Sequence, residues 1–338
     1  MRCSVFVVCG ALLLFLVARP VLHGQTTVTL PEPVDSDGDG LSDELEQSLL
    51  SEFAPNFMMD GQDCSNLPAE FMRDLNVPKV QAENGTIYGQ VFPVMTASSA
   101  GQTLELHFYH LWSQDCGSRG HPLDTEHVSV LVRASGGTGS VARWRAVYWY
   151  AAAHEDTVCD VSQITRAVTL KAEDHGATVW ISPGKHASFL DPELCHRGCG
   201  SDRCENMQSF AVNQVVNLGE IERPMNGALW TSSPSWPLAA KMTGSDFPAI
   251  PLARLETLPS SDIAWFNPGR HPTQGMIAIS NSTADAVATS GDNTFTAISV
   301  AGDSTGNALA KSYRKTVHAI GTSARHVGNA LRPKPKTK

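Results

Sequence analysis

A histidine and two carboxylates lie close together where a strand is expected to begin. Residues 120–126 read GHPLDTE, and they lead into the alternating run HVSVLV at residues 127–132. Side chains two apart in a strand point to one face, so Asp124 and Glu126 should share a face with the valines of the core. Two half-buried carboxylates repel each other and lose hydration, and a divalent cation relieves both effects. Together with His121 they suit Mg²⁺, Mn²⁺, Ca²⁺ or Zn²⁺, although a loop with ordinary solvated charges is the alternative interpretation.

The most specific motif is an acidic loop, DSDGDGLSDELE, at residues 35–46. Its carboxylates fall at loop positions 1, 3, 5, 9 and 12, and a glycine stands at position 6, which is the spacing of a calcium-binding loop. The expected ligands are Asp35, Asp37, Asp39, Leu41 through its backbone carbonyl, Asp43 and Glu46. Because Pro31 and Pro33 disfavour a helix before the loop, it resembles the lone EF-hand-like loops of thrombospondin-type or dockerin-type repeats. Such a Ca²⁺ site stiffens an extracellular protein, whereas the alternative is a solvated acidic turn.

Residues 1–24 are predicted to be a secretory signal peptide. Arg2 precedes an apolar stretch from Val5 to Val17, and Gly24 offers a cleavage point. No later stretch is long and apolar enough to span a membrane. A secreted or extracytoplasmic protein without a transmembrane segment is therefore expected.

Six cysteines follow the predicted signal peptide: Cys64, Cys116, Cys159, Cys195, Cys199 and Cys204. An even number in an exported protein predicts up to three disulfides. The last three cysteines are close enough in sequence to hold zinc instead, but export favours disulfides.

Composition and periodicity together predict the fold. The 338-residue chain carries a formal net charge of −9, so general nucleic-acid binding is not expected, and its 27 glycines and 20 prolines favour strands and turns. A helix is predicted over residues 42–53, where apolar side chains repeat at helical spacing. Strands are predicted over residues 104–112, 127–133, 143–152, 177–182 and 210–217. The expected fold is mainly β: an antiparallel β-sandwich with a short N-terminal helix and a C-terminal amphipathic helix.

The predicted organisation divides the mature chain into four parts. They are the calcium loop and helix at residues 25–60, the β-sandwich at 61–245, an irregular segment rich in Ser, Thr and Gly at 246–306, and a basic amphipathic helix and tail at 307–338. The last helix either docks on the acidic body or binds an anionic lipid or polymer surface.

Several segments resemble known families. Residues 120–126 match the G-H-x-x-D-x-E heptapeptide of necrosis- and ethylene-inducing-like proteins, and they are similar to the G-H-x-x-D-W-E-H-V segment of the vacuolar-protein-sorting-sixty-two-like family. Residues 49–55 resemble the L-A-x-x-Y-A-P helix end of the second family, and residues 184–189 resemble its G-S-H-A-S-Y turn. Residues 148–154 are similar to its strand that ends in a histidine. The resemblance covers about residues 45–220.

The resemblance implies a β-sandwich with the heptapeptide at one end of the core and a divalent metal bound there. By motif position the ligands are His121, Asp124 and Glu126, with Asp115 as the nearby candidate for the upstream aspartate of the necrosis-inducing relatives. Thr125 stands where the second family has tryptophan, and Leu123 replaces a second histidine and removes one polar group. The relatives' toxicity and their binding of plant sphingolipid sugars are therefore not implied for this chain.

Two function classes follow from these residues. The first is a secreted, metal-containing module that binds an extracellular glycan or a lipid head group. The second is a secreted metal-dependent hydrolase, in which a metal-bound water attacks and His154 or His186 is the general base. Both histidines follow predicted strands, and the plain alternative for each is a hydrogen-bonded structural role. The chain contains no H-E-x-x-H or P-loop motif, and a purely structural surface protein is the third possibility.

Overall fold

The computed structural model describes residues 33–94, 102–117, 120–135, 143–155, 157, 160–196, 202–236, 242 and 244–267. Those from Val34 onward belong to a single unit. The predicted signal peptide and the predicted C-terminal helix lie outside the described residues, as do Cys159 and Cys199. Among the described residues, every helix is too short or too polar to cross a bilayer.

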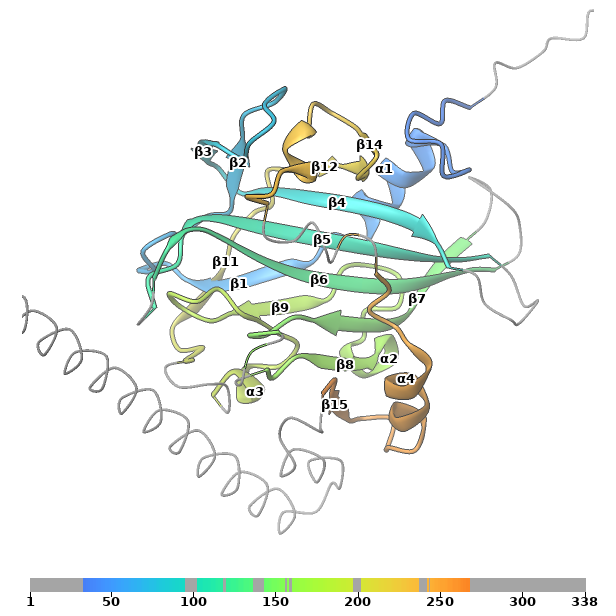
Figure 1. Cartoon of the computed structure of the whole chain (residues 1–338). Helices are drawn as coiled ribbons and strands as arrows, with labels where there is room; N and C mark the ends of the chain where they lie inside the picture. Colours follow the sequence, from blue (N-terminus) through green and yellow to red (C-terminus); the bar gives the residue numbers. More distant parts are fainter. Residues whose placement is uncertain are drawn as a thin grey trace, which may run out of the picture. The chain divides into compact units, whose positions relative to one another are not determined.

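Two packed sheets form a β-sandwich (Figure 1). The larger sheet has seven strands in the order β12-β4-β5-β6-β7-β8-β15, and the smaller has four in the order β10-β9-β1-β11. The larger sheet consists of β4 (Thr86–Pro93), β5 (Thr103–Gln114), β6 (Pro122–Ser135), β7 (Arg143–Ala151), β8 (Gln163–Arg166), β12 (Gln214–Asn217) and β15 (Ile263–Trp265). The smaller consists of β1 (Asn56–Asp60), β9 (Thr178–Ile181), β10 (Ser188–Phe189) and β11 (Met207–Ser209).

Two hairpins stand beside these sheets. One pairs β2 (Ala69–Phe71) with β3 (Val80–Glu83), and the other pairs β13 (Gly219–Glu220) with β14 (Arg223–Pro224). Most strand pairs are antiparallel, so the predicted mainly β, antiparallel sandwich is confirmed. Two pairs are parallel, β1 with β9 and β12 with β4, because long stretches of chain separate their strands.

The helices are short. They are α1 (Asp43–Glu52), α2 (Ala167–Leu170), α3 (Pro192–His196), α4 (Ala249–Glu256) and the 3₁₀ helix η2 (Leu229–Ser232). The Ser42 hydroxyl accepts a hydrogen bond from the Leu45 N–H at the start of α1, which fixes where that helix begins. The predicted N-terminal helix is confirmed.

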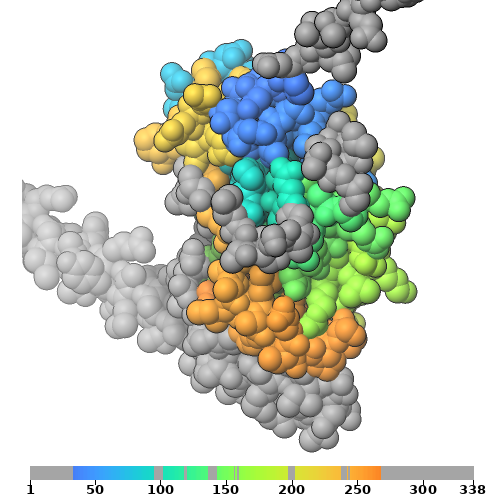
Figure 2. All heavy atoms as spheres, turned by 90° about the vertical axis from the view of Figure 1, so that its right-hand side faces the viewer, coloured from blue at the N-terminus to red at the C-terminus, as the bar shows by residue number. Residues whose placement is uncertain are grey.

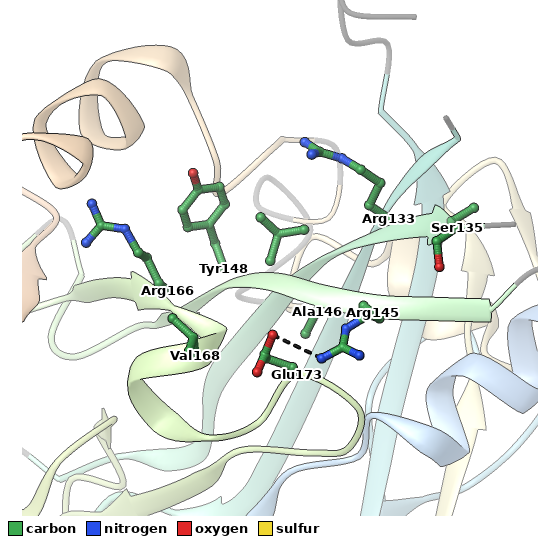
Figure 3. Close-up of a pocket in the computed structure, with 10 residues that line it drawn as sticks. Arg133, Ser135, Arg145, Ala146, Tyr148, Arg166, Val168 and Glu173 are labelled. Atoms are coloured by element: carbon green, nitrogen blue, oxygen red, sulfur yellow. Dashed lines mark hydrogen bonds and ion pairs between the residues drawn. The ribbon is translucent and has the colours of Figure 1, made fainter. Parts of the chain in front are cut away.

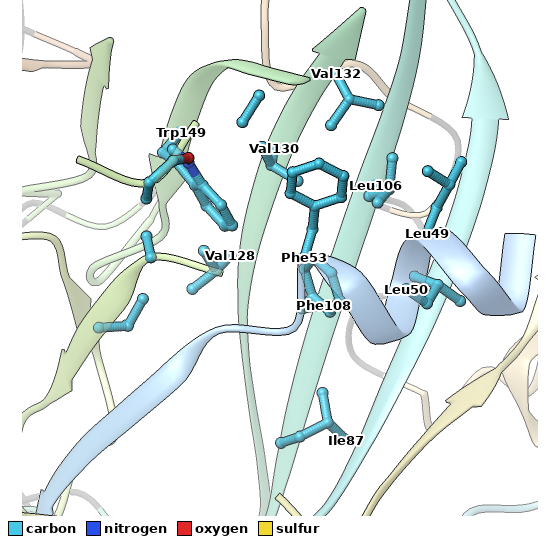
Figure 4. Packing of buried hydrophobic residues seen from close by; sticks show 14 of the residues in the cluster. Leu49, Leu50, Phe53, Ile87, Leu106, Phe108, Val128, Val130, Val132 and Trp149 are labelled. Atoms are coloured by element: carbon cyan, nitrogen blue, oxygen red, sulfur yellow. The ribbon is translucent and has the colours of Figure 1, made fainter. Parts of the chain in front are cut away.

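The main core lies between the two sheets. Val128, Val130 and Val132 point from β6 into it, as the alternation of the sequence predicts. In Figure 4, Leu49 of α1 and Phe53, which directly follows that helix, pack against the same core. Fully burying each such side chain stabilises the fold by about 1.5–3 kcal/mol relative to leaving it exposed.

The outer face of the larger sheet is also covered. Tyr109 packs there with Trp230, and Tyr150 packs with Phe247. Ten consecutive residues of β5 are therefore buried, although a half-exposed strand would alternate. Burial on both faces leaves polar side chains of the outer face without access to water.

Three strand boundaries differ from the prediction. β6 begins at Pro122, five residues before the predicted residue 127, because its pairing with β5 extends to Gln114 opposite Pro122. The heptapeptide from Pro122 onward is thus itself part of the strand, and His121 directly precedes it. The predicted strand over residues 210–217 is wrong at its start, since β11 ends at Ser209 and β12 begins at Gln214. The larger sheet also continues past residue 245, because β15 pairs with β8.

Candidate functional site

The acidic loop closes on itself ahead of α1. The N–H groups of Gly38 and Gly40 donate to the two Asp35 carboxylate oxygens, at 2.6 and 3.1 Å. Both glycines have positive φ, +79° and +92°, a conformation that side chains disfavour. One ligand atom from each of Asp35, Asp37 and Asp39 lies within 4.8 Å of the others. The loop therefore gathers carboxylates in the arrangement that its spacing predicts.

Carboxylate oxygens around this loop are buried without hydrogen-bond partners. They are both oxygens of Asp37 and one oxygen each of Asp39, Glu46 and Glu220. Burial and then repulsion from Asp37 and Asp39 raise the pKa of Glu46 to about 8 and that of Glu220 to about 7. Burial and then Asp39 raise the pKa of Asp37 to about 6. Such a set of oxygen donors with excess negative charge fits a calcium ion.

The other two predicted loop ligands have structural contacts. Asp43 accepts hydrogen bonds from the Ser36 N–H at 2.8 Å and the Ser36 hydroxyl at 2.6 Å. Leu41 is buried in the main core. The Asn217 amide donates to Glu46 at 3.3 Å. Calcium binding by the six loop residues remains a prediction.

The hairpin β13–β14 lies against the loop. A side chain at Gly38 would collide with the guanidinium of Arg223, and Glu220 belongs to the same hairpin. Figure 2 shows the N-terminal segment (blue) beside the segment that contains this hairpin (yellow). Glu220 is a candidate ligand that sequence reasoning missed, because no motif connects it to a loop about 180 residues earlier.

The heptapeptide lines a cavity of about 310 Å³ at one end of β6. Its walls bring together all four predicted metal ligands, one of the two predicted histidines and a lysine: Asp115, His121, Asp124, Glu126, His154 and Lys185. The sequence therefore identifies most of the polar lining of this cavity, which is here called the heptapeptide pocket.

Lys185 neutralises Asp115 in this pocket. Its ammonium lies 2.6 Å from Asp115 Oδ2, and the Gly117 N–H donates to Oδ1 at 2.6 Å. His121 Nε2 lies farther away, 3.7 Å from the same Oδ2, with its side chain 56 % exposed. Gly120 lets the chain pass close to the Asp115 backbone, where a side chain would collide.

His186 lies beneath the pocket, between two carboxylates. Its Nδ1 is 2.9 Å from Asp124 Oδ2, and its Nε2 is 3.7 Å from Asp63 Oδ2. The ring is fully buried and stacks on Trp112, with centroids 4.2 Å apart. This histidine supports Asp124 and does not line the cavity, so the general-base role is less suited to it than to His154.

His154 has its own acidic partner. Its Nε2 lies 2.7 Å from Asp202 Oδ2, and Asp202 is buried. Burial alone would lower the pKa of His154, but the charge and hydrogen bond of Asp202 outweigh burial and raise it. A histidine with a raised pKa holds its proton more firmly, which suits proton donation better than proton abstraction.

Unusual backbone conformations cluster around the pocket. Leu123, His154 and His186 have φ of +61°, +53° and +53°, and they are three of the seven described non-glycine residues with positive φ. Such conformations are costly for residues with side chains and concentrate at functional sites. This observation supports the pocket as a site independently of the motif.

The predicted heptapeptide ligands do not converge as a metal site requires. Among the described residues, three groups of His, Cys, Asp and Glu bring their ligand atoms within 4.8 Å: one is in the acidic loop, one contains Asp63, Cys64 and His186, and one contains His107, His127 and Asp246. None includes the heptapeptide histidine, and Cys64 is already in a disulfide. The second metal site remains a prediction that needs side-chain rearrangement.

Two disulfides are present among the described residues, Cys64–Cys116 and Cys195–Cys204. The disulfide prediction is confirmed for these four cysteines, and zinc binding by Cys195 and Cys204 is excluded while they are bonded. Cys116 follows Asp115 directly, so the first bond holds the edge of the heptapeptide pocket.

A second cavity of about 390 Å³ lies over β7. Figure 3 shows three arginines, Arg133, Arg145 and Arg166, around it, with an ion pair between Arg145 and Glu173 at 3.1 Å. The Arg166 guanidinium donates to the carbonyl of Leu255 at 2.5 Å, so it fastens the end of α4 to the sheet. Two of the three arginines thus have structural partners.

Comparison with known proteins gives two similar solved structures. One is the non-toxic HaNLP3 protein, at 10 % identity and a TM-score of 0.33, covering 60 % of this chain and 81 % of that one. The other is the Necrosis and Ethylene inducing Protein 2 from the causal agent of cocoa's Witches Broom disease, at 14 % identity and a TM-score of 0.29, covering 59 % and 84 %. No family model and no curated protein matches the sequence. At these scores neither structure identifies the function of this chain.

Proposed function

We propose that this protein is a secreted β-sandwich that binds a polar extracellular ligand, a glycan or a lipid head group, in the heptapeptide pocket. The supporting observation is the mixed lining of that pocket. Asp124 and Glu126 offer hydrogen-bond acceptors, and Lys185 and His121 offer donors. The cavity of about 310 Å³ is at the small end of ligand pockets, which suits one sugar ring or one head group.

A divalent cation is the proposed aid to binding. Asp115, His121, Asp124 and Glu126 supply the mixed oxygen and imidazole donors that Mg²⁺, Mn²⁺, Ca²⁺ or Zn²⁺ accept. The cation has to displace Lys185 from Asp115 and share Asp124 with His186. In this proposal the N-terminal loop holds a separate, structural Ca²⁺ ion.

Arrays of glycans and of lipid head groups test the binding function directly. The wild-type protein is compared with Asp124→Asn and Lys185→Gln, in Mn²⁺ and in chelator. In chelator both variants should lose at least about tenfold in affinity, equal to about 1.4 kcal/mol, since each removes a charged contact in the pocket. Glu173→Gln, in the other cavity, is the control and should bind normally. Equal binding by all four proteins contradicts the proposal.

A metal-dependent hydrolase is the second candidate, and the His154–Asp202 pair favours it. A buried carboxylate that orients a histidine beside a pocket is a common arrangement for proton transfer. His154 would then donate a proton to the leaving group, and a divalent cation held by the predicted ligands of the pocket would supply an activated water. Saturable turnover of phosphoester, ester or glycoside substrates, lost in His154→Gln and in chelator, would support this candidate. Ligand binding without turnover favours the binding module.

A further inference from the structure

Another group of buried side chains lies on the outer face of the larger sheet, opposite the face that carries the heptapeptide carboxylates. His107 on β5 and His127 on β6 stack with their rings almost parallel, at 2°, and their centroids 5.9 Å apart. Asp246, just before α4, reaches both: its Oδ2 lies 3.0 Å from His127 Nε2 and 3.7 Å from His107 Nδ1. The histidines are buried, and the Asp246 side chain is 13 % exposed.

Glu105 determines which nitrogen of His107 carries a proton. Its Oε1 lies 2.8 Å from His107 Nε2 and accepts the Asp246 N–H at 2.7 Å, and its Oε2 accepts the Ser245 hydroxyl at 2.6 Å. Because Glu105 already accepts bonds from the Asp246 N–H and the Ser245 hydroxyl, the ring nitrogen of His107 that faces it is assigned as a third donor. His107 Nδ1 is then the nitrogen with a free lone pair, directed toward Asp246.

That lone pair has no hydrogen-bond partner. His107 Nδ1 is buried without one, and 3.7 Å is too long for a hydrogen bond to Asp246. A nitrogen lone pair and a carboxylate that face each other across such a gap repel. A proton on Nδ1 would not remove the problem, because it would be buried without an acceptor at bonding distance. A cation between the two atoms satisfies both.

We propose that His107 Nδ1, His127 Nε2 and the Asp246 carboxylate bind a transition-metal cation of the zinc type. All three ligand atoms lie within 4.8 Å of one another. A tetrahedral zinc site with bonds of about 2.0–2.1 Å separates its ligand atoms by about 3.3 Å. The observed 3.0 and 3.7 Å lie on either side of that separation. Imidazole nitrogens favour Zn²⁺ over Ca²⁺ or Mg²⁺, which prefer oxygen donors.

The contacts around His107 match those of a metal-binding histidine, whereas Nδ1 of His127 is buried without a hydrogen-bond partner. A ligating histidine commonly donates its other N–H to a carboxylate, and Glu105 accepts that bond here. The Ser129 hydroxyl donates to Asp246 Oδ2 at 2.6 Å and orients that carboxylate. The metal would pin the segment around Asp246 to the middle of the sheet, so its role is structural.

Cobalt is the probe for this site, because tetrahedral Co²⁺ absorbs strongly in the visible. The protein carries His121→Ala and Asp124→Asn, which remove two candidate ligands of the heptapeptide pocket, and it is stripped with chelator before titration. We expect one equivalent of tetrahedral Co²⁺ that Zn²⁺ displaces. The absence of a tetrahedral spectrum in this correctly folded background overturns the proposal, and no ligand variant is needed for that outcome.

Variants then assign the ligands. Asp246→Asn keeps the side-chain volume but weakens the metal ligand, and His107→Gln removes the free lone pair, so both should abolish the cobalt spectrum. Glu105→Gln tests positioning and should weaken Co²⁺ binding about 10–100-fold while the spectrum keeps its shape. The assignment is overturned if the cobalt spectrum survives unchanged in folded Asp246→Asn or folded His107→Gln. Glu173→Gln is the control, and loss of the spectrum in that variant also overturns the assignment.

Discussion

The N-terminal loop and the heptapeptide pocket both gather carboxylates, but their charges are balanced differently. In the loop, Asp37 has two buried oxygens without partners, and Glu46 and Glu220 have one each. The pKa of Glu46 is raised to about 8, first by burial and then by its acidic neighbours. No cationic side chain lowers the pKa of Asp37 or Glu46, although the Arg223 guanidinium lies against Gly38. The loop is therefore short of positive charge.

Cationic groups and histidines of the protein itself already stand beside the acids of the pocket. Lys185 contacts Asp115, and His186 contacts Asp124. These partners come from segments far from the heptapeptide in sequence. The pocket therefore offers a partly neutralised polar surface to a ligand, whereas the loop offers a concentrated negative charge to an ion.

The difference teaches that carboxylate spacing alone does not distinguish a metal site from a polar ligand site. Both sequence motifs predict a cation, but only the loop leaves oxygen atoms that nothing in the described structure satisfies. The cost of an unsatisfied buried carboxylate makes a bound cation much more favourable there. Loss of a cation should consequently destabilise the loop more than the pocket.

The largest expected effect concerns the disulfide that holds the pocket. Replacing Cys64 and Cys116 by alanine should lower the free energy of unfolding by about 4 kcal/mol, because the bond closes a loop of 52 residues. Ligand binding in the pocket should weaken, while stabilisation by calcium should persist. Denaturant unfolding measures the first effect. The matched control replaces Cys195 and Cys204, which close only 9 residues, and should cost about 2.5 kcal/mol. Equal losses for the two pairs would contradict this prediction.

Calcium should give the next largest effect. At a hundredfold excess over Kd, calcium should stabilise the protein by about 2.7 kcal/mol and raise Tm by about 5–10 °C. Asp35→Ala and Glu46→Ala should remove this rise, with melting temperatures in chelator affected less than those in calcium. Glu220→Gln should reduce it if the hairpin contributes a ligand. Asp174→Asn, on an exposed acid, is the control. Identical wild-type melting curves in calcium and in chelator would end the assignment.

The pH dependence of stability should differ with and without calcium. Glu46 has a pKa of about 8 in the folded protein against an ordinary 4.5, so the calcium-free folded state binds a proton that the unfolded state releases. This contribution is complete below about pH 4.5 and is lost as the pH rises through 8. Calcium-free stability should therefore fall across this range, and calcium should stabilise most at the alkaline end. Denaturant midpoints at pH 5.5 and pH 8.5 measure it, with Glu46→Gln as the variant that flattens the calcium-free profile. If the free energy of unfolding without calcium rises between pH 5.5 and pH 8.5, its pH dependence has the opposite sign, and protonation of Glu46 does not explain it.

Local patterns account for the parts of the structure that the sequence predicted. The loop and α1 depend on contacts between residues within one turn, such as the Ser42 cap. The alternation of the valines in β6 indicates which face of that strand is buried. Both can be recognised in short windows of sequence. The four predicted metal ligands that line the heptapeptide pocket were found for the same reason, since three of them lie within one short motif.

Long-range contacts account for the parts that sequence did not predict. Glu46 meets Asn217 across 171 positions, and Asp246 joins His127 across 119. Lys185 belongs to a recognised motif, but nothing in that motif indicates an ion pair with Asp115. The register of the strands creates such contacts, and single-sequence periodicity carries no register. Asp246 was also assigned to an irregular segment, although the structure buries its neighbour Phe247 against the sheet.

The smallest expected effect tests whether Lys185 is what keeps a cation out of the pocket. Lys185→Gln removes the ammonium that lies 2.6 Å from Asp115, so Asp115 becomes available to a metal. Affinity for Mn²⁺ in the pocket should rise by about tenfold, or about 1.4 kcal/mol, because a like charge beside the ion has gone. Stability should change little, since a partly exposed ion pair contributes at most about 1 kcal/mol.

Lys171→Gln, outside the pocket, is the control. Titration with Mn²⁺ measures the change in affinity, in the presence of Ca²⁺ that fills the loop. Weaker Mn²⁺ binding by Lys185→Gln would mean that this lysine does not compete with the ion. Stronger Mn²⁺ binding by Lys185→Gln would make the pocket behave like the loop. It would show that the two regions differ in their positive countercharge and not in their number of carboxylates.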